Sequence, residues 1–328
     1  MKFRRIGQTE IDCSIIGLGT GRLASVSGGV SRTAAVNLFG VAEDLGINLI
    51  DTADSYAQGE CEKIIGQALQ GKRSQFIITT KAGYSFSSVA GGLRLLKPLA
   101  KKVLKMFKGG RSLAGSVRTN VSRQDFTAAY IQRAVDSSLQ RLQTDYIDIF
   151  LLHTPPLQVM SDAQLFDLLR QLKQQGKIRH FGVSSNDPVV LGKAASLAGL
   201  SVVQTPVNPL QMGSEGALKK LAASKVGIVA NQVFLSGKLV GSQAPNEDEA
   251  RQVSASKDRL EILAKQKGIS LNHLLIQYAL MQPGLVSVLS GTTKQEHLKQ
   301  NVADALSEVS YSAEELNLIQ ASAPLPQI

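Results

Sequence analysis

Four residues of the 328-residue chain, Asp51, Tyr56, Lys81 and His153, have types that suit proton transfer to a carbonyl group. Reduction of a carbonyl needs a hydride donor and a proton for the developing alkoxide. A tyrosine can supply this proton if a neighbouring cation lowers its pKa, which is about 10 when unperturbed. We expect Lys81 to be this cation, Asp51 to pair with it, and His153 to hydrogen-bond the carbonyl oxygen.

Polar residues directly follow six apolar segments of the chain, INLI, FIITT, IDIFLL, HFGV, SVV and GIVA. In this order the polar residues are Asp51, Lys81, His153, Ser184, Gln204 and Asn231. If the segments are parallel strands of one barrel, all six residues open onto the carboxyl-terminal face, where catalysis takes place in that architecture. The pattern therefore predicts one site.

The elements that must position this site alternate along almost the whole chain. Eight strands are expected at residues 14–18, 47–50, 76–80, 146–152, 179–183, 201–203, 227–230 and 285–289. Helical spacing of apolar residues marks 33–45, 129–142, 161–174 and 271–281. Eight strands alternating with helices predict an α/β fold, a closed (β/α)8 TIM barrel. Residues 3–13 are expected to form an N-terminal β-hairpin around Gly7-Gln8 that plugs the barrel bottom, and residues 1–328 to form a single domain.

Two connections, residues 82–125 and 235–253, are longer than a barrel needs, so we expect enlarged loops over the same face. No acidic residue occurs between Glu62 and Asp125, whereas 13 Lys and Arg residues do, and most of these lie in the first connection. The whole chain carries a net charge of +10. Residues 94–108 can form a lid helix with one apolar and one basic stripe. The basic face of segment 94–123 is either simply solvated or steers an anionic cofactor or acidic substrate.

Composition excludes several other classes. The chain contains no run of about 18 apolar residues, so we expect no membrane span, and the first residues lack the pattern of a signal peptide. Cys13 and Cys61 lie far apart, so we expect no disulfide, no metal site and a cytoplasmic location. No nucleic-acid motif accompanies the basic charge, so we expect no nucleic-acid partner.

Several long motifs resemble signatures of the aldo-keto reductase superfamily. The stretches GINLIDTADSYAQGECEKIIGQAL and VDSSLQRLQTDYIDIFLLHTP are similar to its first two signatures, and ITTKAGY, GKIRHFGVSSN and SVLSGTTKQEHLKQN to later motifs. The resemblance spans residues 4 to 320. It implies a catalytic tetrad of Asp51, Tyr56, Lys81 and His153, in which Tyr56 is the general acid in reduction and the base in oxidation.

The resemblance also implies a nicotinamide dinucleotide, usually NADPH with NADH possible, bound without a Rossmann domain. The implied cofactor contacts are Gly19, Thr20, Gly21, Asp51, Ser184, Ser185, Gln204, Gln232, Phe234, Gly291, Thr292, Thr293, Lys294, His297, Gln300 and Asn301. Ser185 stands where the family usually has Asn, and His297 where it has Arg. Asn231 takes the place of the aromatic residue that stacks on nicotinamide, so the carboxamide and stacking contacts depart from the pattern.

The sequence therefore predicts an NADPH-dependent reductase of aldehydes or ketones acting on a small-molecule carbonyl substrate. A sugar dehydrogenase that uses NAD(P)⁺ is the first alternative, because proton transfer through a tyrosine is reversible. A cofactor-sensing, non-catalytic binding subunit is the second. The sequence carries no signature of the particular substrate or of an oligomeric state.

Overall fold

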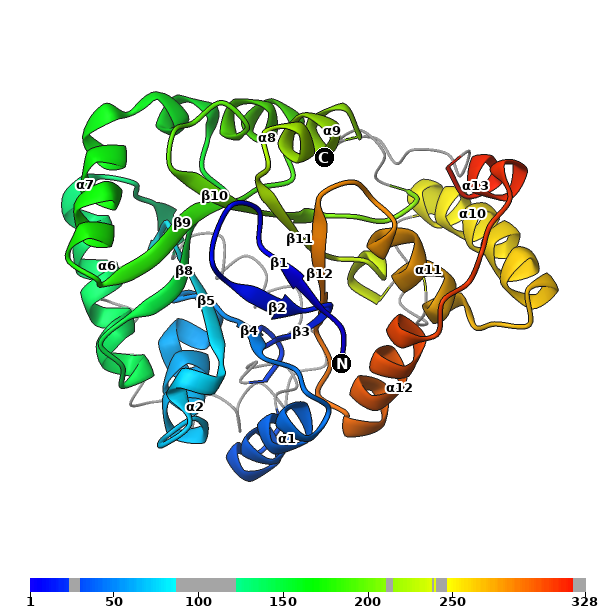
Figure 1. The fold of residues 1–328 in the computed structure, drawn as a ribbon, viewed down its shortest axis with the longest axis horizontal. Helices are drawn as coiled ribbons and strands as arrows, with labels where there is room; N and C mark the ends of the chain where they lie inside the picture. The colour runs from blue at the N-terminus through cyan, green and yellow to red at the C-terminus, as the bar shows by residue number, and fades with distance from the viewer. Residues whose placement is uncertain (24–29, 87–121, 211–214, 238, 240–246, 321–328) are drawn as a thin grey trace.

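Eight parallel strands close into a barrel in the computed structural model, in the order β10, β11, β12, β3, β4, β5, β8 and β9 around the ring (Figure 1). Their bounds are Ile16–Gly19 (β3), Leu49–Asp51 (β4), Ile77–Ala82 (β5), Ile147–His153 (β8), Ile178–Ser184 (β9), Leu200–Pro206 (β10), Gly227–Asn231 (β11) and Leu285–Ser290 (β12). The predicted (β/α)8 barrel is confirmed, and each expected strand differs by at most three residues at either end.

The structure describes residues 1–23, 30–86, 122–210, 215–237, 239 and 247–320. The expected lid helix at 94–108 and nearly all of the basic segment 94–123 lie outside the described residues.

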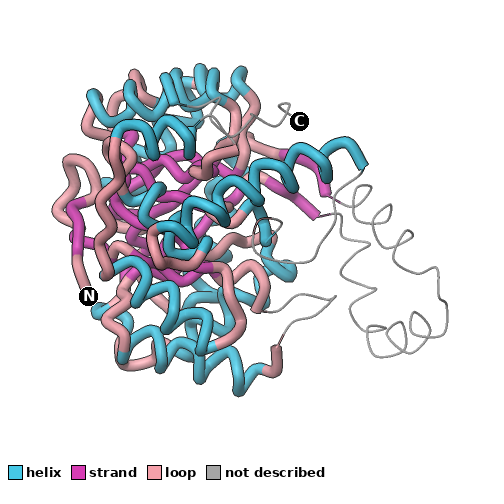
Figure 2. The backbone as a smooth tube through the Cα atoms, turned by 90° about the vertical axis from the view of Figure 1, so that its right-hand side faces the viewer, coloured by secondary structure: helices cyan, strands magenta, loops and turns pink. Residues whose placement is uncertain are grey.

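Helices surround the strands on the outside of the barrel (Figure 2). They are Arg32–Asp44 (α1), Glu60–Ala68 (α2), Ala128–Leu142 (α6), Ala163–Gln174 (α7), Pro188–Ala194 (α8), Glu215–Ala223 (α9), Glu247–Gln266 (α10), Leu271–Leu280 (α11), Gln295–Leu306 (α12) and Ala313–Gln320 (α13). Helices α1, α6 and α7 start at side chains that accept a hydrogen bond from the first turn, those of Ser31, Thr127 and Asp162.

Two apolar layers hold the barrel together. In β8, Ile149 and Leu151 belong to the small cluster inside the barrel, whereas Phe150 and Leu152 pack into the large cluster beneath the helices. Side chains alternate between the faces of a strand, so a closed barrel buries both sets. This double burial explains why its strands read as continuous apolar segments in the sequence.

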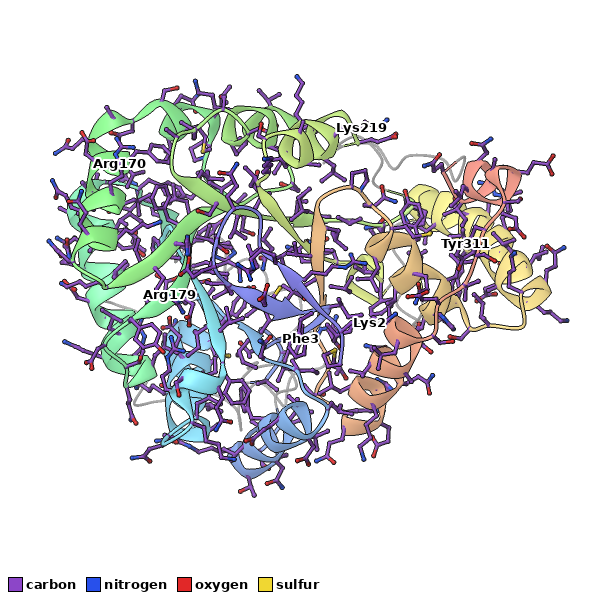
Figure 3. All side chains as sticks on the ribbon, in the orientation of Figure 1. Lys2, Phe3, Arg170, Arg179, Lys219 and Tyr311 are labelled. Carbon is purple, nitrogen blue, oxygen red and sulfur yellow. The ribbon has the colours of Figure 1, made fainter. Side chains whose placement is uncertain are left out.

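The N-terminal hairpin closes the amino-terminal end of the barrel, as predicted. Strands Phe3–Arg5 (β1) and Asp12–Ser14 (β2) pair antiparallel and lie across the barrel opening that faces the viewer (Figures 1 and 3). Ile6 and Ile11 are buried in the interior cluster. Gly7 turns the chain with a φ of +51°, and a Cβ there would lie 2.5 Å from the Lys225 carbonyl oxygen. The close approach therefore requires glycine.

The enlarged loop after the third barrel strand is also present. Its base is a second hairpin, in which Tyr84–Phe86 (β6) pairs with Ser122–Gln124 (β7). The second expected loop is shorter than predicted, because α10 begins at Glu247 instead of beyond residue 253. No helix in the described part of the chain is long and apolar enough to cross a membrane.

Candidate active site

The two-residue repeat of the strands brings the predicted polar residues together at the carboxyl-terminal mouth. Five of them lie two positions after a buried residue of the same strand: Asp51 after Leu49, Lys81 after Thr79, His153 after Leu151, Gln204 after Val202 and Asn231 after Val229. Ser184 is likewise the last residue of its strand, and it pairs with Gln204 across β9 and β10. Lys81 and Gln204 do not end their strands as expected, because β5 continues to Ala82 and β10 to Pro206.

Lys81 and Asp51 form a buried ion pair on neighbouring strands. The Lys81 Nζ donates to Asp51 Oδ1 and to the Thr52 carbonyl oxygen, both at 2.7 Å, and its side chain is 0% exposed. Burial alone would lower the pKa of Lys81, but the charges of Asp51 and Tyr56 outweigh burial and raise it. Lys81 is therefore held as a cation away from water, as the sequence predicted.

Tyr56 lies beside this ion pair. Strand β4 ends at Asp51, and the chain then turns through a short 3₁₀ segment, Tyr56–Gly59, in which Ala57 and Gln58 have left-handed φ angles of 48° and 57°. The Lys81 Nζ is 5.0 Å from the centre of the Tyr56 ring. The turn therefore brings the tyrosine back to the cation that the sequence paired with it.

The expected lowering of the tyrosine pKa is wrong for this structure. The charge of Lys81 is the largest influence and does lower the pKa of Tyr56, but burial and the Asp51 carboxylate together outweigh it and leave the pKa raised. The physical reason is that the group which pairs with Lys81 also lies close to the tyrosine. A raised pKa keeps the hydroxyl protonated at neutral pH, as a proton donor must be.

His153 completes the cluster from the end of β8. Its ring meets the Tyr56 ring edge-on, with centroids 6.1 Å apart, and the Tyr84 ring at 5.2 Å. The Ser55 hydroxyl lies 3.5 Å from its Nδ1. Burial and then the charge of Lys81 lower the pKa of His153 to about 3. The imidazole is therefore neutral near pH 7, with one ring N–H that can donate to an oxygen.

A second set of hydrogen bonds extends from Asp51 across the mouth. Gln204 donates through Nε2 to Asp51 Oδ1 at 2.7 Å, and its Oε1 accepts from the Ser184 hydroxyl at 3.1 Å and from Asn231 Nδ2 at 3.4 Å. The backbone N–H of Ser185 donates to the Gln204 carbonyl oxygen. Three strands thereby hold the amide of Gln204 in one orientation.

The glycine-rich turn after β3 joins this cluster to the segment after β12. The Thr20 hydroxyl and backbone N–H both donate to the Asp51 carbonyl oxygen at 2.9 Å. A Cβ at Gly21 would lie 3.3 Å from the Tyr56 ring, and one at Gly19 would lie 3.6 Å from Gly291 Cα. Motifs that are about 270 residues apart in the sequence are therefore neighbours at the mouth.

The remaining predicted cofactor residues lie in two segments, one after β12 and the other after β11. Lys294, which precedes α12, and His297 in its first turn are exposed, and Thr292 accepts from the Lys294 backbone N–H. Other side chains bond within the protein, Gln300 to Asp304 and the buried Asn301 to Ser290. Gln232 and Phe234 follow β11, and the left-handed Gln232, at a φ of 49°, directs its carbonyl oxygen to Asn208. Thr293 follows Thr292 in the bend between β12 and α12.

Sequence reasoning missed three residues near the four predicted catalytic side chains: Ser55, Tyr84 and Asp54. Ser55 and Tyr84 contact His153, and their positions one residue before Tyr56 and three after Lys81 were the available signal. Asp54 accepts from the Tyr130 hydroxyl at 3.4 Å through Oδ2, and its buried Oδ1 has no partner among the described residues. Burial and then the charge of Glu62 raise the pKa of Asp54 to about 7. Nothing in the sequence indicated this burial.

The barrel carries a buried Lys81–Asp51 ion pair at its carboxyl-terminal mouth, with the Tyr56 ring beside it. The chain belongs to the aldo/keto reductase family, whose model matches residues 15–323. It is therefore an NAD(P)H-dependent oxidoreductase, a class whose members act on small carbonyl compounds.

Relatives align over nearly their full length. A solved aldo-keto reductase from Bacillus halodurans in its holo form superposes with a TM-score of 0.79 at 27% identity, over 100% of this chain and 99% of that one. The uncharacterized oxidoreductase YqkF of Bacillus subtilis (strain 168) is 27% identical, over 98% of this chain and 96% of its own. The NADH-specific methylglyoxal reductase of Escherichia coli (strain K12) is 28% identical, over 92% and 93%.

The residues at the mouth fit a nicotinamide dinucleotide. Gly19 and Gly21 put no side chain into the turn after β3, and a buried acceptor, Asn231 Oδ1, has no donor within the described ranges. No group of three or more His, Cys, Asp or Glu side chains that could hold a metal occurs in the part of the chain that the structure describes.

Proposed function

We propose that this protein reduces aldehydes or ketones to alcohols with NADPH, and that Tyr56 is the general acid. The observation that supports the proposal is the convergence of Asp51, Tyr56, Lys81 and His153 at one end of the barrel, with Lys81 bonded to Asp51 and 5.0 Å from the Tyr56 ring. A bound nicotinamide dinucleotide supplies the hydride in this reaction.

The four side chains have complementary tasks. Neutral His153 donates its ring N–H to the substrate carbonyl oxygen and orients it beside the Tyr56 hydroxyl. Tyr56 gives its proton to that oxygen as negative charge develops there. Lys81 stabilises the tyrosinate that remains, and Asp51 keeps Lys81 charged and in place. In the reverse direction Tyr56 accepts the proton, so the same site suits alcohol oxidation.

The proposed cofactor site runs along the mouth from β9 to α12. Ser184, Ser185 and Gln204 would bind the carboxamide, and the Gly19–Thr20–Gly21 turn and the Gln232–Phe234 segment would flank the nicotinamide and pyrophosphate. Residues 291–294 would surround the ribose, followed by His297, Gln300 and Asn301. Lys294 and His297 are exposed at the start of α12, where they can meet a 2′-phosphate. These two side chains support NADPH over NADH, and the NADH specificity named for the Escherichia coli relative makes a comparison of both cofactors essential.

The direct test is consumption of NADPH and of NADH with a reactive aromatic aldehyde and with methylglyoxal, for the wild type and Tyr56→Phe. Loss of the hydroxyl is expected to lower kcat by about 10²–10⁴-fold. The NADPH dissociation constant, measured by its fluorescence, should change less than twofold because the phenyl ring remains. Lys294→Ala should reduce the preference for NADPH over NADH.

Other outcomes favour the alternative functions. Turnover of NAD(P)⁺ with sugars that exceeds aldehyde reduction, and that is lost in Tyr56→Phe, would establish a sugar dehydrogenase. Cofactor binding with equal background turnover in wild type and variant would contradict a catalytic role and indicate a binding subunit.

A further inference from the structure

The amide oxygen of Asn231 is a buried polar atom at the mouth that has no hydrogen-bond partner among the described residues. Asn231 is the last residue of β11, and its Nδ2 donates to Gln204 Oε1 at 3.4 Å. Its Oδ1 is buried and accepts no hydrogen bond from any residue that the structure describes. Buried acceptors without a donor are rare in native proteins because they lose their hydrogen bonds to water. The atom therefore calls for an N–H or O–H from a bound molecule.

None of the neighbouring polar side chains of the mouth donates a hydrogen bond to this oxygen. The Ser184 hydroxyl donates to Gln204 Oε1, and Gln204 Nε2 donates to Asp51. The Ser185 hydroxyl accepts from the Asp187 backbone N–H at 3.1 Å. Asn231 Oδ1 is thus a buried acceptor that the hydrogen bonds among these described side chains leave unpaired.

The chemistry of the two molecules that the proposed reaction would bring to the mouth, the carbonyl substrate and the dinucleotide, decides which of them can satisfy this acceptor. An aldehyde or ketone group offers only an oxygen acceptor, whereas the carboxamide of a nicotinamide ring carries two N–H donors. Gln204 connects Asn231 directly to Asp51, which bonds Lys81. A donor placed at Asn231 is therefore tied to the same network that holds the proton-transfer residues.

We infer that Asn231 is a cofactor-positioning residue whose Oδ1 accepts an N–H of the nicotinamide carboxamide, which fixes the ring's rotation relative to Lys81 and Tyr56. This inference rests on the proposed cofactor site. It assigns to Asn231 a role in recognising one functional group of the cofactor, which can be measured without turnover.

The experiment compares two dinucleotides by calorimetry, NADP⁺ and its 3-acetylpyridine analogue, in which a methyl group replaces the amide nitrogen and its hydrogens. The wild type should bind NADP⁺ about tenfold more tightly, because the analogue leaves the Asn231 oxygen unpaired. In Asn231→Leu, which keeps the size but lacks the acceptor, the ratio should fall below twofold. In Asn231→Asp, which retains an acceptor oxygen, the ratio should stay near the wild-type value.

A third ligand separates this contact from the rest of the site. Binding of 2′-phospho-ADP-ribose, which lacks the nicotinamide, should change less than twofold in Asn231→Leu. The inference is overturned if Asn231→Leu keeps the wild-type ratio of the two dissociation constants, or if that ratio is near one in the wild type. Either result leaves the proposed function standing. Failure of the wild type to bind NADP⁺ and NAD⁺ overturns the proposed function and the inference together.

Discussion

Lys81 donates to Asp51 across 2.7 Å inside the barrel mouth, where the two side chains are 0% and 5% exposed. An ion pair shielded from water in this way is sensitive to the loss of one partner. A lone buried charge keeps its desolvation penalty without the attraction that offset it. The pair is thus important for the stability of the barrel as well as for the proposed chemistry.

Replacement of Asp51 by Asn should expose this dependence. We expect Asp51→Asn to lower the free energy of unfolding by about 3–5 kcal/mol, because Lys81 is left as an unpaired buried cation. The double variant Asp51→Asn/Lys81→Met should recover most of that loss. Urea denaturation of the wild type, Asp51→Asn, Lys81→Met and the double variant measures the coupling. Losses that simply add in the double variant would contradict a shared origin in the ion pair.

His153 should make folding less favourable in acid. Its pKa in the folded protein is about 3, against 6.5 ordinarily, so the unfolded chain binds a proton in this range that the folded protein does not. Stability must therefore fall as the pH drops below 6.5. We expect the wild type to lose up to about 2 kcal/mol more than His153→Gln between pH 7 and 5. Parallel stability curves for the two proteins would contradict a neutral His153.

Asp54 should have the opposite dependence. Its pKa is raised from 3.8 to about 7, so between these values the folded protein holds a proton that the unfolded chain releases. Stability contributed by the protonated form is present at low pH and is lost as the pH rises toward 7 and above. From pH 5 to 8 the wild type should lose about 2 kcal/mol relative to Asp54→Asn. Thermal unfolding in matched buffers measures this difference, and a constant difference would show that Asp54 is ionised throughout.

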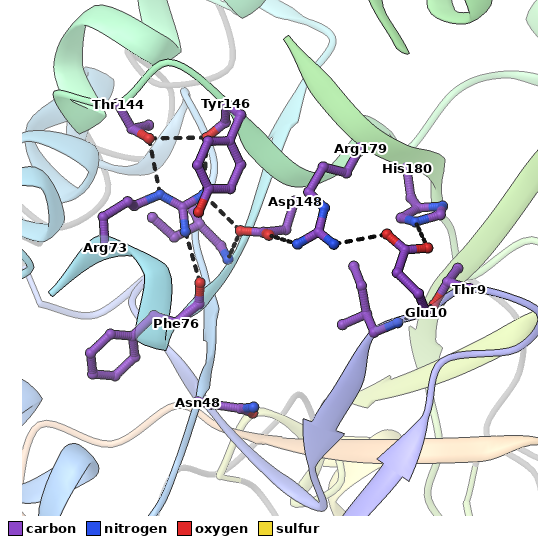
Figure 4. A network of polar contacts seen from close by, with 12 residues as sticks. Thr9, Glu10, Asn48, Arg73, Phe76, Thr144, Tyr146, Asp148, Arg179 and His180 are labelled. Carbon is purple, nitrogen blue, oxygen red and sulfur yellow. Dashed lines mark hydrogen bonds and ion pairs between the residues drawn. The ribbon is translucent and has the colours of Figure 1, made fainter. Parts of the chain in front are cut away.

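Asp148 joins two arginines at the opposite end of the barrel (Figure 4). It accepts from Arg73 at 2.6 Å, from Arg179 at 3.0 Å and from the Ile78 backbone N–H at 2.9 Å, and it is 2% exposed. Arg179 also bonds Glu10 of the hairpin. We expect Asp148→Asn to cost about 3 kcal/mol of stability and to leave kcat unchanged, because this network is remote from the mouth.

The exposed pair Arg170–Asp167 on α7 offers a matched control (Figure 3 labels Arg170). Its ion pair is as short as that of Arg73 and Asp148, at 2.6 Å, but its side chains are 46% and 63% exposed. Asp167→Asn should therefore cost less than about 1 kcal/mol. Chemical denaturation of both variants tests whether burial, more than distance, determines the contribution. Similar losses in the two variants would refute this explanation.

Much of the fold and the location of the site could be predicted from the sequence, because both depend on local patterns. Apolar segments of strand length identified all eight barrel strands, since a closed barrel buries both faces of each strand. The polar residue after each segment, such as Asp51 or His153, identified the mouth, because parallel strands all point the same way. The types of these residues then suggested proton transfer as the chemistry of the candidate site.

Only the tertiary structure decided how those residues affect one another. The raised pKa of Tyr56, where the sequence predicted a lowered one, results from burial and from Asp51 lying close to both Tyr56 and Lys81. The pKa of Asp54 and the unpaired oxygen of Asn231 likewise depend on which atoms water can reach. Spacing along a chain determines which face of a strand a side chain occupies. Distances and desolvation among residues on different strands arise only when the barrel closes.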